Sequence, residues 1–306
     1  MSADPVRAIA DAVLYEGYIL WPYRRSALKN QQRFTFGGVF PPAHRRIHPD
    51  DADTMRAEVL LRGEADVEVA VRFLQVVQRT VLGADGEPVD ERVVDGERLQ
   101  AWEEAVEREI AGPGPISISA GNERDGFIVR HWQRLAGEVE VRAASAGRPG
   151  LRRITVTVRN LTPFAGVTRQ EALEHAFCST HMLLRAGAGG AFVSLTDPPG
   201  ELAREAAACR NVGCWPVLVG DPDRTDTMLA SPIILQDHPR IAPESPGDMF
   251  DGGEIDQLLV LNILALTDEE KSQMAACDPR AAEILARVEA LDPDQLMALH
   301  GRTALR

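Results

Sequence analysis

Two histidines and a cysteine have a spacing that could serve metal chemistry: His175, Cys178 and His181 occupy positions i, i+3 and i+6. Imidazole nitrogen and thiolate sulfur are common ligands of zinc. On a helix this spacing spreads the side chains over about 120°, so two of them could share one metal ion, whereas all three would be strained. Cys209 and Cys214 could complete a site if the fold brought them near. A metal-dependent enzyme with zinc or another divalent metal at these residues is therefore one hypothesis.

These residues also fit ordinary structural roles in a protein core. Cys178 beside Phe177 is typical of a small buried residue, and His181 of a hydrogen-bonded core histidine. A Cys178 nucleophile with His181 as its base is also conceivable, but no orienting third group is evident. The chain contains no GxGxxG, P-loop, HExxH, CxxC or GxSxG pattern, and the glycines at 187–190 predict a hairpin turn. The sequence therefore favours a protein without catalytic activity or cofactor, and leaves the question of an enzyme open.

Acidic residues gather between positions 248 and 256. Asp248, Asp251, Glu254 and Asp256 offer the oxygen ligands that hard cations prefer, although their spacing differs from that of a calcium loop. Carboxylates are also favoured where a helix begins, because the N-terminal end of the helix dipole is positive. We interpret this loop as the start of a helix, and the enzyme hypothesis retains it as a second place for a metal.

A basic segment near the N-terminus is the other candidate site. Arg24, Arg25, Lys29 and Arg33 offer dense donors for a carboxylate, a phosphate or an acidic peptide. If residues 26–33 are helical, Arg25, Lys29 and Arg33 lie on one face at i, i+4 and i+8. Because three like charges repel one another, we expect an acidic partner, which is either the chain's own acidic loop or tail or an external molecule.

Aromatic residues lie beside these cations. Tyr15, Tyr18, Trp21 and Tyr23 include every tyrosine of the chain. Such residues anchor many protein interfaces, although they are more often part of a core. We call residues 15–33 the basic-aromatic segment, and the sequence predicts that it contacts a partner.

Composition and charge exclude several classes of protein. The 306 residues are 44% hydrophobic and 26% charged, which is ordinary for a globular protein and excludes a disordered or fibrous one. The net charge of −13 disfavours a nucleic-acid binder or a ligand of anionic membranes. No apolar run approaches the roughly 18 residues of a membrane span, and no signal peptide is visible. Four cysteines are too few for a disulfide scaffold, so we expect a cytoplasmic protein.

Periodicity predicts an α+β fold, mostly an antiparallel sheet or sandwich with peripheral helices and a helical C-terminal tail. Strands are expected at 34–40, 55–62, 67–81, 116–120, 127–132, 137–144, 151–160, 182–185, 191–195, 215–219 and 228–235. Strands 55–62 and 67–81 are expected to form one hairpin, and 182–185 and 191–195 another. Helices are expected at 5–15, 97–111, 168–180, 201–209 and 254–266, with one or two turns at 26–32. Thr168 with Glu171, Thr267 and Asp278 carry helix-start signals.

The domain prediction follows from this pattern. Residues 1–266 are expected to form one α+β domain, with a subdivision near 161–167 left open. Residues 267–306 are expected to form a helical tail that packs on it. The strand order and the oligomeric state remain open.

Three stretches carry a resemblance to a known family. They are residues 10–40 (ADAVLYEGYILWPYRRSALKNQQRFTFGGVF), 231–252 (SPIILQDHPRIAPESPGDMFDG) and 254–271 (EIDQLLVLNILALTDEEK). Together they are similar to an uncharacterised bacterial family associated with actinobacterial NiFe-hydrogenase gene clusters. The resemblance covers both ends of the chain and much of its middle. It brings no catalytic residues, and it implies an accessory, assembly or maturation role.

The leading functional hypothesis combines these observations. It is a non-catalytic accessory or assembly factor for a NiFe-hydrogenase, whose partner is a protein client such as a hydrogenase subunit. The basic-aromatic segment would bind an acidic surface of the client, and Asp248, Asp251 and Glu254 would shape a second face. The binding residues would be Tyr18, Trp21, Tyr23, Arg24, Arg25, Lys29 and Arg33. The alternative is the metal-dependent enzyme that uses His175, Cys178 and His181 or the acidic 248–256 loop.

Overall fold

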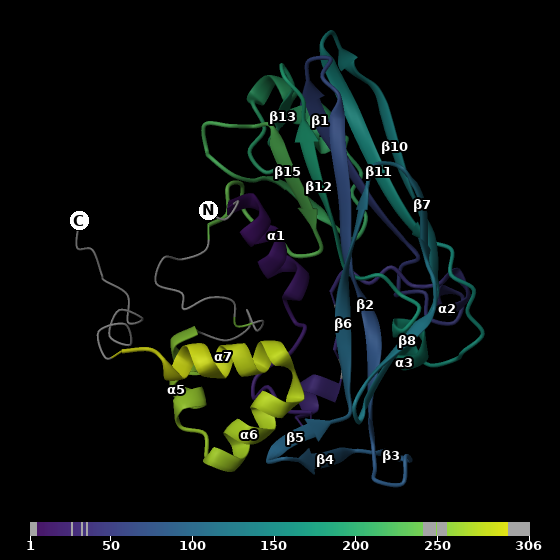
Figure 1. Ribbon diagram of the computed structural model, residues 1–306. Helices are drawn as coiled ribbons and strands as arrows, with labels where there is room; N and C mark the ends of the chain where they lie inside the picture. The colour runs from purple at the N-terminus through teal and green to yellow at the C-terminus, as the bar shows by residue number, and fades with distance from the viewer. Residues whose placement is uncertain are drawn as a thin grey trace.

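Two large antiparallel sheets face one another and carry a group of helices beside one end (Figure 1). The structure is a computed structural model, and it describes residues 5–25, 27–31, 33–34, 36–240, 249 and 256–292. Helices lie at the margins of the sheets, and three of them follow one another near the C-terminal end. The predicted α+β class with a mostly antiparallel sheet is therefore confirmed.

The smaller of these sheets has five strands. Their order is β13 (Ala191–Val193), β1 (Thr54–Arg62), β11 (Leu151–Asn160), β10 (Leu135–Arg148) and β7 (Gly114–Ile118). Each neighbouring pair is antiparallel. Met55, Ala57 and Val59 are buried and alternate with half-buried residues, as the two-residue period of a strand requires. This face of the sheet therefore forms one wall of a core.

The larger sheet has eight strands built around one long one. Their order is β14 (Trp215–Leu218), β15 (Thr227–Ser231), β12 (Cys178–Ala186), β2 (Val67–Leu82), β9 (Ile128–Trp132) and β8 (Gly121–Asp125), and β6 (Trp102–Ala111) and β3 (Pro88–Val89) also pair with β2. Strand β6 runs along one edge of β2, whereas β12 and then β9 share the other edge. The middle of β2 is therefore enclosed on both edges.

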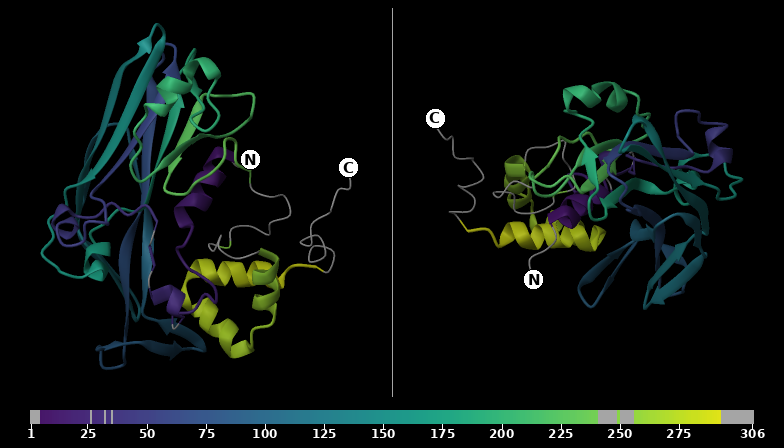
Figure 2. Two further views of the ribbon diagram at one scale, coloured as in Figure 1. Left: turned by 180° about the vertical axis from the view of Figure 1, so that it is seen from behind. Right: turned by 90° about the horizontal axis from the view of Figure 1, so that it is seen from above.

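Two hydrophobic clusters lie on opposite faces of the larger sheet. One fills the space between the two sheets, with Val59, Phe73, Val156 and Phe177 among its buried members. The other lies where β2 and β6 meet the basic-aromatic segment and the C-terminal helices. These helices are α5 (Asp256–Leu264), α6 (Asp268–Cys277) and α7 (Pro279–Glu289). Figure 2 shows them on one side of the molecule, below helix α1 (Pro5–Tyr15).

The helix starts predicted at Thr267 and Asp278 are confirmed, whereas the end of the predicted helical tail, residues 293–306, lies outside the described residues. Thr267 caps α6 in a capping box with Glu270, and Asp278 caps α7 with Pro279 at its first position. The remaining short elements are α2 (Pro42–Arg45), α3 (Arg169–Leu173), α4 (Ala203–Ala207), the 3-10 turns η1 (Leu28–Gln31) and η2 (Gly200–Leu202), and the hairpin of β4 (Glu91–Val94) with β5 (Glu97–Gln100).

The predicted helix at 97–111 is wrong. These residues form β5 and β6, and β6 pairs with β2 over ten consecutive residues. Glutamates of β6 lie beside arginines of β2, with Glu104 2.8 Å from Arg79 and Glu107 bonded to Arg72. Local helix propensity is a weak preference that tertiary pairing overrides, and here the pairing compensates two buried arginines.

Both predicted hairpins are also wrong, although their strands are present. β1 and β2 lie in different sheets, and so do β12 and β13. Each pair is joined by a crossover between the sheets. The Gly63 amide donates to the carbonyl of Gly150, and the Gly187 amide to that of Asp66. Gly63 has φ +89°, and a Cβ there would lie 2.4 Å from the carbonyl oxygen of Gly189, so the crossover requires glycine.

Two further local predictions need correction. Residues 34–40 form no named strand over their described positions, because only Val39 pairs there, through an isolated bridge to Phe177. The predicted helix at 168–180 ends early, since α3 covers Arg169–Leu173 and strand β12 begins at Cys178. The capping box between Thr168 and Glu171 is nevertheless present, so the helix start is confirmed.

Candidate functional site

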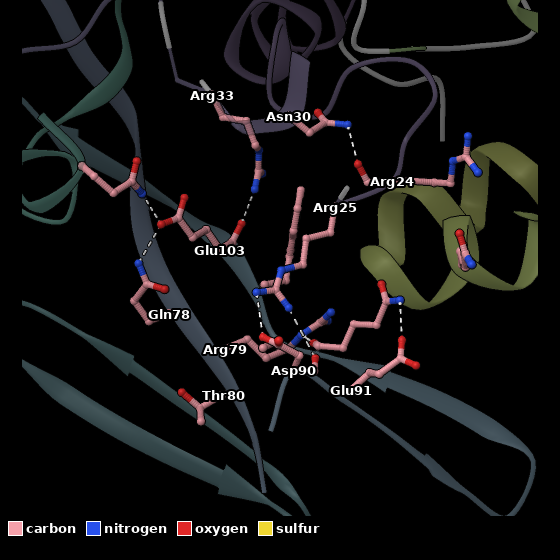
Figure 3. Close-up of a pocket in the computed structure, with 15 residues that line it drawn as sticks. Arg24, Arg25, Asn30, Arg33, Gln78, Arg79, Thr80, Asp90, Glu91 and Glu103 are labelled. Carbon is pink, nitrogen blue, oxygen red and sulfur yellow. Dashed lines mark hydrogen bonds and ion pairs between the residues drawn. The ribbon is translucent and has the colours of Figure 1, made fainter. Parts of the chain in front are cut away.

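A cavity of about 900 Å³ lies where the basic-aromatic segment meets strands β2 and β6, the β4–β5 hairpin, and helix α6 (Figure 3). Its volume is within the range of ligand-binding pockets. Three of the four cations predicted as binding residues line it, together with residues that are 45 or more positions away in sequence. The lining residues are Arg24, Arg25, Asn30, Arg33, Gln78, Arg79, Thr80, Asp90, Glu91, Gln100, Ala101, Trp102, Glu103, Gln170 and Gln273.

Asn30 holds the basic-aromatic segment in a closed loop. Its side chain accepts from the Leu20 amide at 2.8 Å, and donates to the carbonyls of Leu20 at 2.8 Å and Arg24 at 3.1 Å. Asn30 is buried, so these bonds satisfy polar groups that water does not reach. These hydrogen bonds therefore fix the backbone of the loop that carries Arg24 and Arg25.

The tyrosines of this segment belong to the core. Tyr18 and Tyr23 are 1% and 0% exposed. The Tyr18 hydroxyl donates to the Asp278 carboxylate at 2.7 Å, and the Tyr23 hydroxyl donates to the Met249 carbonyl at 2.7 Å. Burial raises the pKa of Tyr18 far above its usual value, and the Asp278 charge adds to this. The prediction that these tyrosines contact a partner is therefore wrong, whereas Trp21 is half-buried.

Arg33 lies inside the fold rather than on an exposed helix face. It is 3% exposed, and its guanidinium lies 4.0 Å from the centre of the Trp102 ring and 4.7 Å from that of Tyr18. Its Nε and Nη1 donate to the carbonyls of Tyr18 and Glu103, each at 2.6 Å. The described part of the chain supplies no carboxylate within ion-pair distance of Arg33.

The predicted stripe of Arg25, Lys29 and Arg33 is therefore wrong. Among the described residues of this stretch, only Leu28–Gln31 is helical, and as a 3-10 turn it does not repeat every four residues. Arg25 and Lys29 are exposed while Arg33 is buried.

The other arginines of the cavity have carboxylate partners. Arg24 Nη1 lies 3.1 Å from Glu270 at the start of α6. Arg25 Nη2 lies 3.0 Å from Asp90, whose side chain is 85% exposed. This second pair is open to water, and such pairs contribute about 0–1 kcal/mol. Arg25 is therefore held in place only weakly.

Arg79 forms the floor of this region and joins the sheet to the C-terminal helices. Its guanidinium pairs with Glu104 at 2.8 Å and donates to the carbonyls of Ala276 at 3.1 Å and Cys277 at 2.7 Å. These two carbonyls end helix α6, where the helix dipole favours a cation. Arg79 was not predicted as a site residue. The sequence feature that could have identified it is an arginine within the largely apolar strand β2, together with the adjacent glutamates Glu103 and Glu104 of the strand that pairs with β2.

Three buried donors at the cavity have no hydrogen-bond partner in the described part of the chain. They are Nη2 of Arg33, Nε of Arg24 and Nε1 of Trp102. An unpaired buried donor costs ~1–3 kcal/mol. All three belong to residues that line the cavity. The cavity therefore has donors for which the described residues supply no acceptor.

The carboxylate of Glu103 does not meet this need. Its Oε1 accepts from Gln78 Nε2 at 2.9 Å and also from Gln170 of helix α3 (Figure 3). The Glu103 carbonyl is the atom that faces Arg33. Gln78, Trp102 and Glu103 were not predicted as site residues, because nothing in the sequence places β6 beside residue 33.

The residues predicted as metal ligands lie elsewhere. His175 follows α3, and its Nδ1 lies 3.1 Å from the carbonyl oxygen of Glu171. Cys178 and His181 belong to β12 and are 0% exposed. Burial raises the pKa of Cys178 to about 12 and lowers the pKa of His181 to about 3, so the thiol is protonated and the imidazole neutral.

The helical arrangement predicted for His175, Cys178 and His181 is therefore wrong, since a strand begins within it. Cys214 bonds to the Arg56 carbonyl, and Cys209 to that of Glu205. Over the described residues, no three His, Cys, Asp or Glu side chains form a group that could hold a metal ion. A metal at these residues remains a prediction.

The acidic loop is largely outside the described residues. Asp248, Asp251 and Glu254 lie outside them, so their prediction as a second binding face or a metal site stays a prediction. Helix α5 begins at Asp256, which agrees with a helix start in this region. Met249 of this loop accepts from Tyr23, so one point of the loop contacts the basic-aromatic segment.

Membrane association and similarity to other proteins were also considered. Across the described residues, none of the helices combines the length and the apolar character needed to cross a bilayer. No protein-family model matches this chain. A comparison with curated proteins likewise found no match. The function must therefore be argued from the cavity and its donors.

Proposed function

We propose that this chain is a non-catalytic accessory or assembly factor that binds an acidic segment of a protein client in the cavity. The observation that carries the proposal is the set of unpaired buried donors on Arg24, Arg33 and Trp102. A protein interior satisfies nearly all of its polar groups, so unsatisfied ones call for an explanation. A ligand that brings acceptor oxygens supplies one.

Local charge supports an acidic ligand. The chain has a net charge of −13, yet four arginines converge on this one cavity. Three of the four have carboxylate partners and Arg33 has none among the described residues, so an acidic segment can bond Arg33 there while the rest of this anionic molecule repels it. Arginine suits this task because its planar guanidinium bonds a carboxylate through two donors.

The client is proposed from the resemblance described above. A family associated with NiFe-hydrogenase gene clusters suggests a hydrogenase subunit as the client, and therefore a cytoplasmic site of action. The cavity supports only the chemical class of the binding segment. We accordingly test binding with a hydrogenase subunit, and test the chemistry with peptides.

The proposal is tested by co-purification of the tagged chain with co-expressed NiFe-hydrogenase subunits at low and high salt. Arg25→Glu reverses the charge of an exposed cavity residue, so we expect it to remove most of the recovered subunit at low salt. Arg142→Glu is the matched control, because Arg142 is 73% exposed on β10, in the other sheet. Equal recovery with both variants and the unaltered chain would overturn the proposal.

A further inference from the structure

We infer that the anchor of the bound segment is a single carboxylate, which takes Arg25 from Asp90 and bonds the donors of Arg33 and Trp102. This inference rests on the proposed function. It specifies the chemical group that binds in the cavity and the residue, Asp90, that competes with it. Asp90 then acts as a built-in competitor that occupies the site while the client is absent.

Arg25 extends into the cavity from the loop and reaches Asp90 on the opposite side (Figure 3). Its Nη2 bonds the Asp90 carboxylate at 3.0 Å, while its Nη1 lies 3.5 Å from the Asp90 carbonyl, at the limit of a hydrogen bond. Since the pair is exposed and water competes for both partners, replacing Asp90 by another carboxylate costs little. The ion pair can therefore exchange partners.

The donors behind this pair are fixed in position. Arg33 is held by two carbonyls and stacks on Trp102, so its Nη2 and the Trp102 indole have little freedom to find other partners. Both atoms are shielded from water. In the proposed bound state the carboxylate reaches them after Arg25 has left Asp90. A carboxylate, with two oxygens and about four lone-pair positions, can accept from all three residues at once.

The charge of the lining favours a monoanion. Arg24, Arg25 and Arg79 each have a carboxylate partner, whereas Arg33 has none among the described residues. Glu103 of the same lining accepts from two glutamines and has no cation partner among the described residues, so additional negative charge on a ligand meets repulsion there. A phosphate monoester carries about −1.5 to −2 at pH 7 and would meet Glu103 and Glu91 as well as Asp90 in the same lining. A carboxylate fits the charge, and a phosphorylated segment is disfavoured.

The probe for the test is a fluorescein-labelled peptide amide that alternates glycine and glutamate, with glutamine and phosphoserine versions as comparisons. Fluorescence polarisation measures its affinity for the full chain. We expect Asp90→Asn to tighten binding of the glutamate peptide about two- to fivefold, because the competitor is lost. Glu91→Gln is the matched control, since Glu91 lines the same cavity but pairs with Arg98 instead. It should tighten binding less.

One further variant examines the donors. Trp102→Phe keeps one aromatic ring against Arg33 and removes the indole N–H together with the second ring, so we expect binding about three- to tenfold weaker. Circular dichroism of each variant establishes that the fold is retained. If Trp102→Phe does not fold, Asp90→Asn still decides, because Asp90 is an exposed residue whose loss leaves the core intact.

The outcomes separate this inference from the proposed function. Equal tightening by Asp90→Asn and Glu91→Gln, or tighter binding of the phosphoserine peptide than of the glutamate one, would overturn the carboxylate anchor while leaving client binding in place. If the subunit co-purifies with the Arg25→Glu variant as well, the proposed function fails irrespective of the peptides. Tightening specific to Asp90→Asn together with loss in Trp102→Phe supports the anchor.

Discussion

The guanidinium of Arg33 lies 4.0 Å from the centre of the Trp102 ring, inside the fold and between two chain segments 69 positions apart. Its Nε and Nη1 bond backbone carbonyls on both segments, and its Nη2 remains unpaired. A residue that the sequence marks as part of a solvated cationic stripe is thus a structural cross-link. It also forms the innermost cation of the cavity.

This cross-link predicts a loss of stability when Arg33 is replaced. Arg33→Met removes two charge-assisted hydrogen bonds and the stacking on Trp102, and it leaves the Tyr18 and Glu103 carbonyls unpaired. We expect the free energy of unfolding to fall by about 2–3 kcal/mol. Urea denaturation measures it. Arg142→Met, at an exposed position, should change it by less than about 0.5 kcal/mol, and equal effects would contradict the cross-link.

Arg79 predicts a different effect, confined to the C-terminal helices. Arg79→Met leaves Glu104 and the last carbonyls of α6 without their shared partner. Breaking a buried pair costs about 3 kcal/mol, so amide hydrogens of α6 and α7 should exchange much faster. Arg98→Met is a suitable comparison, because Arg98 also bonds α6, at the exposed Glu269. Unchanged exchange in the Arg79 variant would show that the helices are held by their apolar contacts alone.

Because His181 is buried, we expect the protein to lose folding stability as the pH falls. Burial lowers the pKa of His181 to about 3, whereas the unfolded chain binds a proton near pH 6.5. The unfolded state therefore binds the proton first, so this contribution to stability is complete above pH 6.5 and declines as the pH falls toward 3. The slope is about 1.4 kcal/mol per pH unit.

Urea midpoints between pH 7.5 and 5 measure this slope before most carboxylates titrate. His181→Gln has no imidazole to protonate, so its stability should change less over the same interval. If both proteins lose stability in parallel, another group is responsible and the prediction is wrong.

Metal analysis examines the enzyme alternative. Cys178 would have to lose a proton from a thiol whose pKa burial raises to about 12, and neither Cys178 nor His181 reaches the surface. We expect purified protein to hold far less than one equivalent of zinc or another divalent metal by elemental analysis. One equivalent that disappears in Cys178→Ser would contradict this expectation. One equivalent that persists in that variant would direct attention to the acidic 248–256 loop.

The amino-acid sequence by itself determined most of the strands and several helix ends. Alternation of Ile154, Val156 and Val158 identified β11, and the Asp278–Pro279 pair identified the start of α7, because both signals depend on neighbouring residues. It also determined that residues 24–33 concentrate positive charge in a chain whose net charge is −13. Three of the four cations predicted there do line the cavity.

Only the tertiary structure decided what those cations do. Arg25 meets Asp90 and Arg24 meets Glu270, partners that are 65 and 246 positions away. The strand pairing of residues 102–111 with β2 placed Trp102 beneath Arg33, against the local preference for a helix. Local periodicity records which face of an element is apolar, but it holds no information on which distant element meets that face. Contacts between elements that are distant in sequence therefore decide which carboxylate pairs with each arginine and which residues line the cavity.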